Sequence, residues 1–412
     1  MNLRFLAPPL ILVISACSSG PSGEANAAPS GDILIASDLT IFAVQGGGDA
    51  LQASEAIQLA VSEHPTVGGH RLAYWSLDNA LAGVQSPEKG VQNVRRMADD
   101  PRVLGMVGPW TSTQASLEIP EGNRKDLVMV SPSNTSGCLT VPDPKKCSPE
   151  PADLRPSGRN NYFRLAPPDA VQGRAMGRYA AETLKLTRVA AINEWGRDGD
   201  LAIADFATEF SRLNGSLVFS RNVPGGTTNF SGVIAEAVAK HAQAIYAQGD
   251  TYDSICIARA QMPPEMLLLG TDGFSNDPDC LTQAGAGAHG IIATWADVDA
   301  SRSTEARAMS ETAKFTKMFP GTKIFGNYVF AAYDCTLILI AAIQQAMDEN
   351  HGTVPNRRQV LDAVARTAAF EGVTGTYSFD QNGDAVSPLM SVYSVEGGAW
   401  VYKGKIEAAA TP

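Results

Sequence analysis

Residues 103–137 read VLGMVGPWTSTQASLEIPEGNRKDLVMVSPSNTSG and contain two short apolar runs, each followed by hydroxyl-bearing residues. The runs at 103–107 and 127–130 have the length and branching of buried parallel strands, with a helix-length connection between them. Both strands are therefore expected to end at the same edge of one sheet, where open α/β sheets bind ligands.

The residues that follow the two strands predict an anion-binding crevice. WTSTQ at 110–114 and SPSNT at 131–135 supply side-chain hydroxyls, and Thr111 and Ser112 stand where the N-cap of the next helix is expected. Because helix N-termini present free N–H groups and a partial positive charge, a small carboxylate is the expected guest. Either cluster alone is equally consistent with helix capping, but the repetition favours a site.

Length and charge limit the possible partners. The 412 residues, 44% of them apolar, are enough for two to three packed domains. The net charge is −11 and no Lys/Arg cluster exceeds a pair, which argues against nucleic acid. The partner is expected to be a small molecule or a protein.

The first 16 residues are expected to be an export signal. Arg4 precedes the apolar run at 10–14, which is too short to span a bilayer. The sequence ISAC, ending at Cys17, resembles the bacterial lipobox, in which the Cys is lipid-modified and begins the mature protein. An ordinary secretory signal cleaved near residues 25–28 is the alternative. Residues 17–31 are rich in Gly, Ser, Pro and Ala and predict a flexible tether.

Export to an oxidising compartment favours disulfides among the other five cysteines. Cys138 and Cys147 bracket a Pro-rich loop beside the second hydroxyl cluster and are the strongest expected pair. Cys256, on an expected helix, and Cys280, in an expected loop, form a second pair. Cys335 remains as a buried free thiol.

The sequence contains no pattern that predicts a metal, a cofactor or a catalytic centre. No C-x-x-C or H-E-x-x-H spacing occurs, so a zinc site is unsupported. DQNGD at 380–384 has its Gly at the fourth position instead of the sixth, so an Asn-Gly hairpin turn is preferred to a calcium loop. There is no G-x-S-x-G, and the five His form no recognisable arrangement, which argues against an enzyme.

Alternating strands and helices predict two sheets in succession. The first series begins with a strand at 33–36, and Pro167 and Pro168 mark a crossing out of it. The second series includes helices at 172–184 and 252–261.

After a last strand at 290–293, long helices at 305–318 and 328–348 are expected to pack back on the first series. GTYSF at 375–379, the DQNGD turn and residues 388–402 are predicted to form a terminal hairpin.

From about residue 32 to 403 the sequence resembles the bacterial periplasmic-binding proteins of the leucine/isoleucine/valine type, the amino-acid-binding subunits of ABC transporters. Seven segments in order carry the resemblance: VLGMVGPWTSTQAS, LVMVSPSNTSGCLT, NYFRLAPPDAVQGRAMGRY, VAAINEWGRDGDLA, AIYAQGD, MLLLGTDGFSND and FEGVTGTYSFDQNGD. The resemblance implies an α/β type I periplasmic-binding fold, in which two doubly wound parallel-sheet lobes are joined by three crossovers. The first lobe would comprise 32–163 plus 294–375, and the second 164–293 plus 376–412.

The resemblance also implies site residues. It carries the family's carboxylate contacts onto the two hydroxyl clusters, its acidic anchor for the α-ammonium onto Asp272, and its second-lobe aromatic residue onto Trp195. The alternatives are that Asp272 caps a turn and that Trp195 plugs the lobe surface. The second-lobe position where many relatives have Tyr reads Ala247-Gln248, and Trp110 is bulky, so the side-chain pocket is expected to differ from one for branched aliphatics. The expected ligand-binding set is Trp110, Thr111, Ser112, Ser133, Asn134, Thr135, Trp195, Gln248 and Asp272.

The resemblance implies an extracytoplasmic solute-binding subunit of an ABC importer, which captures an amino acid, branched-chain or otherwise apolar, by closing two lobes. Its partners would be the ligand, permease and ATPase subunits, and a membrane through the lipid anchor. The alternatives are a binding protein for an amide, urea or aromatic acid, in which Asp272 would be dispensable, and a sensory lipoprotein of the same fold.

Lipid anchoring can be tested at Cys17. Because stable attachment needs two anchoring signals, which the acyl chains on this cysteine would supply, Cys17→Ala should release soluble protein. Fractionation of cells followed by immunoblotting measures the distribution. An intact Cys17→Ala protein that stays in the membrane fraction would contradict the lipobox interpretation.

Overall fold

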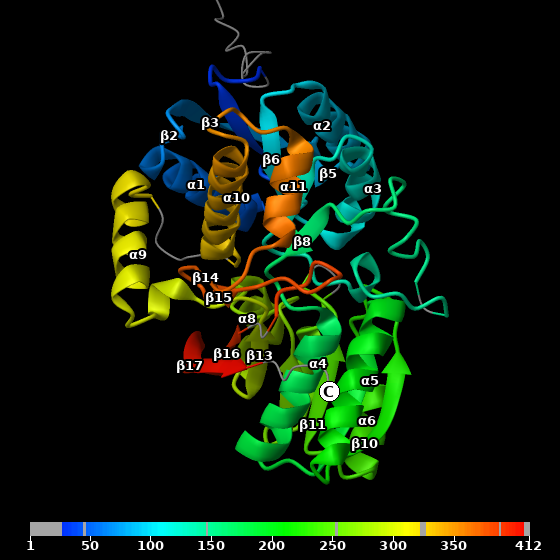
Figure 1. The fold of residues 1–412 in the computed structure, drawn as a ribbon. Coiled ribbons are helices and arrows are strands. Elements are labelled where there is room, and N and C mark those ends of the chain that lie inside the picture. Colours follow the sequence, from blue (N-terminus) through cyan, green and yellow to red (C-terminus); the bar gives the residue numbers. More distant parts are fainter. Residues whose placement is uncertain are drawn as a thin grey trace, which may run out of the picture.

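The computed structural model of this protein describes residues 27–43, 47–145, 147–251, 254–321, 327–386 and 389–407. The chain forms two α/β lobes, each a sheet covered by helices, with the first lobe above the second in Figure 1. The expected signal peptide at 1–16 and Cys17 lie outside the described residues.

The first sheet is parallel except for one short edge strand. Along β1, Ile33 and Ile35 enter one core cluster while Leu34 and Ala36 enter the other, so both faces of the sheet are buried. From edge to edge the strands are β2 (Thr66–Val67), β3 (His70–Asp78), β1 (Ile33–Leu39), β6 (Val103–Val107), β7 (Val128–Ser131) and β8 (Tyr162–Arg164).

Two sets of helices cover this sheet. On one face lie α2 (Pro87–Asp99) and α3 (Ser112–Asn123). On the other lie α1 (Gly47–Glu63), α9 (Ala306–Met318), α10 (Val329–Glu349) and α11 (Arg357–Ala365). The last three come from the C-terminal part of the chain and pack back on the first lobe, as predicted for α9 and α10. α10 is apolar enough to cross a membrane, but 83% of its most apolar window is buried, which identifies it as a core helix.

The second sheet has five parallel strands followed by two antiparallel ones. In order they are β10 (Ser216–Asn222), β9 (Arg188–Asn193), β11 (Ala244–Gln248), β12 (Leu267–Gly270), β13 (Ile291–Trp295), β16 (Leu389–Glu396) and β17 (Ala399–Glu407). One face carries α4 (Asp169–Arg178) and α5 (Arg197–Arg212); the other carries α6 (Ser231–Ala239), α7 (Ile257–Gln261) and α8 (Pro278–Ala284).

The chain passes between the two lobes three times, after β8, after β13 and after α11. Two small antiparallel pairs lie outside the large sheets: β4 (Ala80–Leu81) with β5 (Val84–Gln85), and β14 (Phe370–Glu371) with β15 (Thr376–Tyr377). This architecture confirms the predicted fold class of two doubly wound lobes joined by three crossovers.

The terminal hairpin was predicted around the wrong turn. β15 pairs with β14, while β16 pairs with β17 around Gly397 and Gly398, which both have positive φ. A two-residue turn with positive φ at both positions matches the twist of the flanking strands, so Gly-Gly makes the long hairpin. The DQNGD turn exists, but it closes locally, through a bridge between Phe379 and Ala385.

Two smaller expectations also need correction. Of the helix predicted at 252–261, the structure contains only α7, which begins at Ile257. Residues 252–253 lie outside the described residues. Cys280 lies on α8 instead of in a loop, because Asp277 caps the helix and Pro278 occupies its first turn. The structure nevertheless contains both expected disulfides, Cys138–Cys147 and Cys256–Cys280, and Cys335 is a buried free thiol.

A buried ion pair joins the last strand of the first sheet to the third crossing. Arg164 at the end of β8 has a fully buried side chain, and its Nε donates to Oδ1 of Asp384 at 2.6 Å. The Asp384 carboxylate also accepts from the Thr140 hydroxyl at 2.9 Å. The DQNGD turn thus supplies the counter-charge for a guanidinium that water does not reach.

Removing this counter-charge should destabilise the protein strongly. Asp384→Ala leaves a buried charge unpaired and is expected to lower the free energy of unfolding by about 3–5 kcal/mol. Asp362→Ala is the matched control, because it breaks a surface pair with Arg358 and should cost less than about 1 kcal/mol. Urea unfolding followed by circular dichroism measures both, and equal losses would contradict the role assigned to Asp384.

Candidate functional site

The loops after β6 and β7 lie against each other at the carboxyl edge of the first sheet. Ser131 Oγ donates to the Pro109 carbonyl at 2.9 Å, and Ser133 Oγ donates to the Trp110 carbonyl at 2.6 Å. The fully buried Asn134 donates its amide to the same Trp110 carbonyl at 2.8 Å. The two hydroxyl clusters therefore meet in the structure, and Asn134 holds them together.

Two hydroxyls of this edge have both acceptor positions occupied by the protein itself. Thr111 Oγ1, the N-cap of α3, accepts from the Gln114 N–H at 3.3 Å and from Gln85 Nε2 at 2.7 Å. Ser112 Oγ accepts from the N–H groups of Thr135 at 3.3 Å and of the next residue at 3.2 Å. A hydroxyl has two lone pairs and one proton, so each of these groups is left with an O–H to donate.

The α3 N-terminus adds to this donor character. The first turn of a helix has backbone N–H groups without intrahelical acceptors and a partial positive charge. Thr111 satisfies the N–H of Gln114, and the turn begins at Ser112, beside the two hydroxyl donors. This edge of the first lobe is suited to bind an acceptor group, such as a carboxylate, with neutral donors.

The second lobe places Trp195 directly against the loop that carries Asp272. A Cβ added at Gly273 would lie 2.6 Å from the Trp195 ring and 2.4 Å from the carbonyl oxygen of Gly249. The indole Nε1 of Trp195 donates to Asp250 at 3.2 Å, which fixes the ring over the glycine. Residues from the loops after β9, β11 and β12 are thereby brought together.

Asp272 lies between the lobes with one oxygen engaged. Its Oδ2 accepts from the hydroxyl of Tyr328 at 2.6 Å, whereas Oδ1 is buried and has no hydrogen-bond partner within the described ranges. Burial raises the pKa of this carboxyl, although Tyr328 and the nearby Gln172 amide act in the opposite direction. The Tyr328 ring also packs edge-on against Trp110, with 6.1 Å between ring centroids, so one residue contacts both halves of the expected site.

Several other buried polar groups near this edge of the second sheet are unsatisfied. Gln248 ends β11 fully buried beside the Tyr246 hydroxyl, and neither of its amide atoms completes a hydrogen bond in the part of the chain that the structure describes. The hydroxyls of Thr271 and Ser275, after β12, are likewise buried and unpaired there. Because buried polar groups almost always find a partner, such a group of unpaired atoms indicates a place for a polar ligand or water.

Sequence reasoning missed three residues of this region: Asp169, Gln172 and Tyr328. Asp169 lies where the chain first crosses between lobes, and its N–H donates to the Thr135 carbonyl at 2.8 Å. The Asp272 charge acts on its carboxyl. The segment PPDAVQG was interpreted as a crossing followed by a helix and as part of the resemblance, and nothing in its pattern separates a buried carboxylate from an ordinary helix start.

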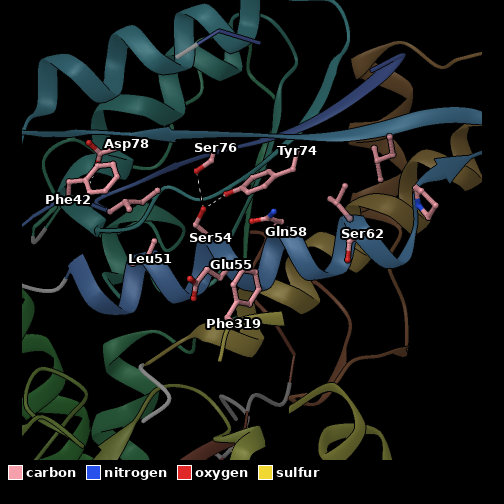
Figure 2. A pocket seen from close by; sticks show the side chains of 14 residues that line it. Phe42, Leu51, Ser54, Glu55, Gln58, Ser62, Tyr74, Ser76, Asp78 and Phe319 are labelled. Carbon is pink, nitrogen blue, oxygen red and sulfur yellow. Dashed lines mark hydrogen bonds between the residues drawn. The ribbon is translucent and has the colours of Figure 1, made fainter. Parts of the chain in front are cut away.

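A separate hollow of about 710 Å³ lies between α1 and β3 in the first lobe (Figure 2). Its wall contains the hydroxyls of Ser54, Tyr74 and Ser76, which are hydrogen-bonded to one another at 2.9 Å. Phe42 and Phe319 line the same hollow. Since its buried hydroxyls already have partners, this hollow lacks the unsatisfied groups that mark the edge between the lobes.

The family described as periplasmic binding protein matches residues 41–399. The leucine-specific-binding protein of Salmonella typhimurium is 25% identical over 280 residues, which span 66% of this chain and 67% of that protein.

Solved structures share the fold. A leucine binding protein from Thermotoga maritima has a TM-score of 0.72 at 22% identity, covering 91% of this chain and 98% of its own. The branched-chain amino acid binding protein of Streptococcus pneumoniae, in complex with isoleucine, has a TM-score of 0.71 at 20% identity, covering 91% and 99%. A Rhodopseudomonas palustris solute binding protein in complex with benzoate has a TM-score of 0.69 at 16% identity, covering 93% and 98%.

The contact between Gly273 and Trp195 can be tested by adding one methyl group. Gly273→Ala overpacks the loop and should lower the free energy of unfolding by about 1–3 kcal/mol while changing the near-UV circular dichroism of Trp195. Gly232→Ala, on α6 of the same lobe, is the control, because no atom lies within 4 Å of the added Cβ. The control should be neutral or slightly stabilising. A Gly273→Ala protein with unchanged stability and spectrum would show that the ring is not held there.

Proposed function

This chain belongs to the periplasmic binding protein family, and we propose that it is the extracytoplasmic solute-binding subunit of an ABC importer, which captures a free α-amino acid between two lobes. The single observation that carries the proposal is the opposite polarity of the two edges. The first lobe offers hydroxyl and N–H donors at Thr111 and Ser112, and the second offers the unpaired oxygen of Asp272. A zwitterion needs both.

In this proposal the O–H groups of Thr111 and Ser112 donate to the carboxylate of the ligand, and Asp272 accepts from its ammonium. Thr135 lies beside them, and its side chain acts on the Asp169 carboxyl. Ser133 and Asn134 have the supporting role of holding the Trp110 loop, since each donates to its carbonyl. Neither edge alone can satisfy both charges of the ligand. Because a buried unpaired charge is costly, closure is favoured only when both ends of the ligand are paired.

Aromatic rings support an apolar side chain in the ligand. Trp110 and Tyr328 are in contact, and Trp195 borders the Asp272 loop. The matched relatives named for leucine, and the isoleucine complex, support a branched-chain amino acid as the first candidate. Gln248 distinguishes the pocket, because its buried amide requires a polar contact that branched aliphatics do not make.

An aromatic acid is the second candidate. The fold of the benzoate-bound protein from Rhodopseudomonas palustris is shared, and the same donor edge suits the carboxylate of such a ligand. An aromatic acid has no ammonium, so Asp272 would be dispensable for its binding. The role of Asp272 therefore separates the two candidates.

The family and the lipobox-like sequence that ends at Cys17 support a wider role. We assign the first lobe to 32–163 plus 294–375 and the second to 164–293 plus 376–412. Lobe closure would be the signal that permease and ATPase subunits read, and Cys17 would anchor the protein to the outer face of the membrane. The protein would act by binding alone, without catalysis.

A thermal-shift screen tests the ligand class. Leucine, isoleucine, valine, phenylalanine, benzoate, amides and urea are offered to wild type and to Asp272→Ala. A ligand that binds only the folded state stabilises it by about 2.7 kcal/mol at a hundredfold excess over Kd, so wild type should respond to an amino acid. Asp272→Ala should bind that amino acid at least 30-fold more weakly, since truncating a buried charge partner costs about 2–5 kcal/mol.

The control is Glu236→Gln, which removes a carboxylate from a surface pair with Arg221 on the same lobe and should leave binding unchanged. If Asp272→Ala binds the amino acid as tightly as wild type, the assigned role of Asp272 fails. If wild type responds only to ligands without an amino group, the aromatic-acid or amide candidate replaces the amino acid.

A further inference from the structure

Asp169 begins α4 at the first crossing, with only 5% of its surface exposed. Its N–H is bonded to the Thr135 carbonyl, so its backbone is fixed to the donor edge of the first lobe. Its carboxylate Oδ1 accepts from Gln172 Nε2 at 3.3 Å, one turn further along the helix. Among the described residues, the hydrogen-bonding groups that act on this buried carboxylate are thus neutral: the Gln172 amide and the Thr135 side chain.

Gln172 connects Asp169 to Asp272. The Gln172 side chain is fully buried, and it lies close enough to the Asp272 carboxylate to favour its ionised form. Its Oε1 is buried without a hydrogen-bond partner in the described chain, and the same is true of Asp272 Oδ1. Two carboxyl groups and an unpaired amide oxygen thus converge, and with both carboxyls ionised all three groups are acceptors.

The charges that surround the two carboxylates do not neutralise them. The charged and titratable groups that act on Asp169, Asp272 or the tyrosines beside them come from β8, β11, α5, the segment after β13 and the start of α10. They are Arg164, Tyr246, Asp198, Asp205, Asp297 and Tyr328. Of these, Arg164 alone is positive, and it is paired with Asp384. Buried carboxylates without a cation are costly, so this arrangement calls for a positively charged partner.

We infer that Asp169 and Asp272 form a two-carboxylate subsite for the cationic group of the ligand, held in register by Gln172, and that Asp169 determines specificity for ligands that carry a positive charge. The inference rests on the proposed function, since it identifies where the ammonium of a captured amino acid would lie. Asp169 would contact the ligand from the crossing and Asp272 from the second lobe, so the ammonium would tie the two segments together.

The subsite has a consequence for proton uptake. Burial, and next the charge of Asp272, raise the pKa of Asp169 to about 8, with Thr135 and Arg164 acting in the opposite direction. Without ligand the carboxyl therefore holds a proton at neutral pH, and an incoming ammonium favours its release. Affinity for a cationic ligand should rise with pH through this range, until the amino group of the ligand loses its own proton.

The test uses the exported protein and three probes of one carbon skeleton. L-Leucine has both charges, 4-methylpentanoate lacks the amino group, and 3-methylbutylamine lacks the carboxylate. Isothermal titration compares wild type with Asp169→Asn, which keeps the size of the side chain, at pH 6.5 and 8.5. Two buffers of different ionisation enthalpy report the protons released on binding.

Wild type should bind leucine more tightly at pH 8.5 than at pH 6.5 and release protons at neutral pH. Asp169→Asn should bind leucine about tenfold or more weakly, with less proton release, because a charge-assisted hydrogen bond is lost. Its affinity for 4-methylpentanoate should be unchanged or higher, which also shows that the variant is folded. Glu236→Gln is again the matched control.

Other outcomes separate this inference from the proposed function. If wild type binds leucine but Asp169→Asn binds it equally well, or loses leucine and 4-methylpentanoate to the same extent, Asp169 only stabilises the start of α4 and the inference is wrong. If leucine does not bind but 3-methylbutylamine binds in a manner that depends on Asp169, the subsite stands and the amino-acid proposal fails. If neither cationic probe binds, the subsite is overturned.

Discussion

The rest of the site depends on the interactions of one buried group, the guanidinium of Arg164. It is fully buried, and a buried positive charge is tolerated only where its donors are satisfied. Its Nε donates to Asp384, Nη1 donates to the carbonyls of Asn134 and Ser136, and Nη2 donates to Thr140. One side chain therefore holds a strand end, the turn of the third crossing and the loop that follows β7.

This arrangement sets the polarity of the first-lobe edge. The carbonyls of the loop after β7 turn inward to Arg164, while the N–H groups of Thr135 and the next residue point to Ser112 Oγ. With its acceptor positions occupied, Ser112 can only donate. The positive charge of Arg164 is itself cancelled by Asp384, so the edge presents dipoles and no net charge. In the proposed function, neutral donors would bind a carboxylate there, whereas Asp272 would contribute a charge from the second lobe.

Much of this organisation can be read from the sequence, because it depends on local pattern. The strand at 103–107 was predicted with the bounds that it has, since a short run of branched apolar residues is a local signal. The convergence of the two hydroxyl clusters also follows from parallel strands ending at one edge. What the sequence does not contain is the pairing of distant residues, such as Arg164 with Asp384, which are 220 positions apart. The error in the hairpin has the same origin. A turn does form at 380–384, but the strands on its two sides, β15 and β16, pair with other strands.

The residues missed at the site share a different cause. Helix α4 was expected to begin at residue 172, which left Asp169 in a loop. In the structure the helix begins at Asp169, and the carboxylate of this residue is buried. Single Asp and Gln residues are common near the start of a helix. Only their burial, which the sequence does not reveal, makes these polar groups need a partner. Tyr328 similarly acquires its role from position, because it stands at the N-cap of α10 and reaches Asp272 in the second lobe.

The candidate site of this protein is distinguished by its unsatisfied polar groups, and not by the volume of a cavity. The hollow between α1 and β3 is large enough for a small molecule (Figure 2). However, the Tyr74 hydroxyl in its wall is already hydrogen-bonded to Ser37 at 2.6 Å and to Ser54 at 2.9 Å, so it needs no partner from a ligand. Between the lobes, by contrast, Asp272 Oδ1 and Gln172 Oε1 are buried and unpaired within the described residues. Leaving such groups desolvated costs free energy in every closed state without ligand. In the proposed function, a ligand with the complementary charges would remove this cost, and the groups that need such a ligand are the acceptors of the second lobe.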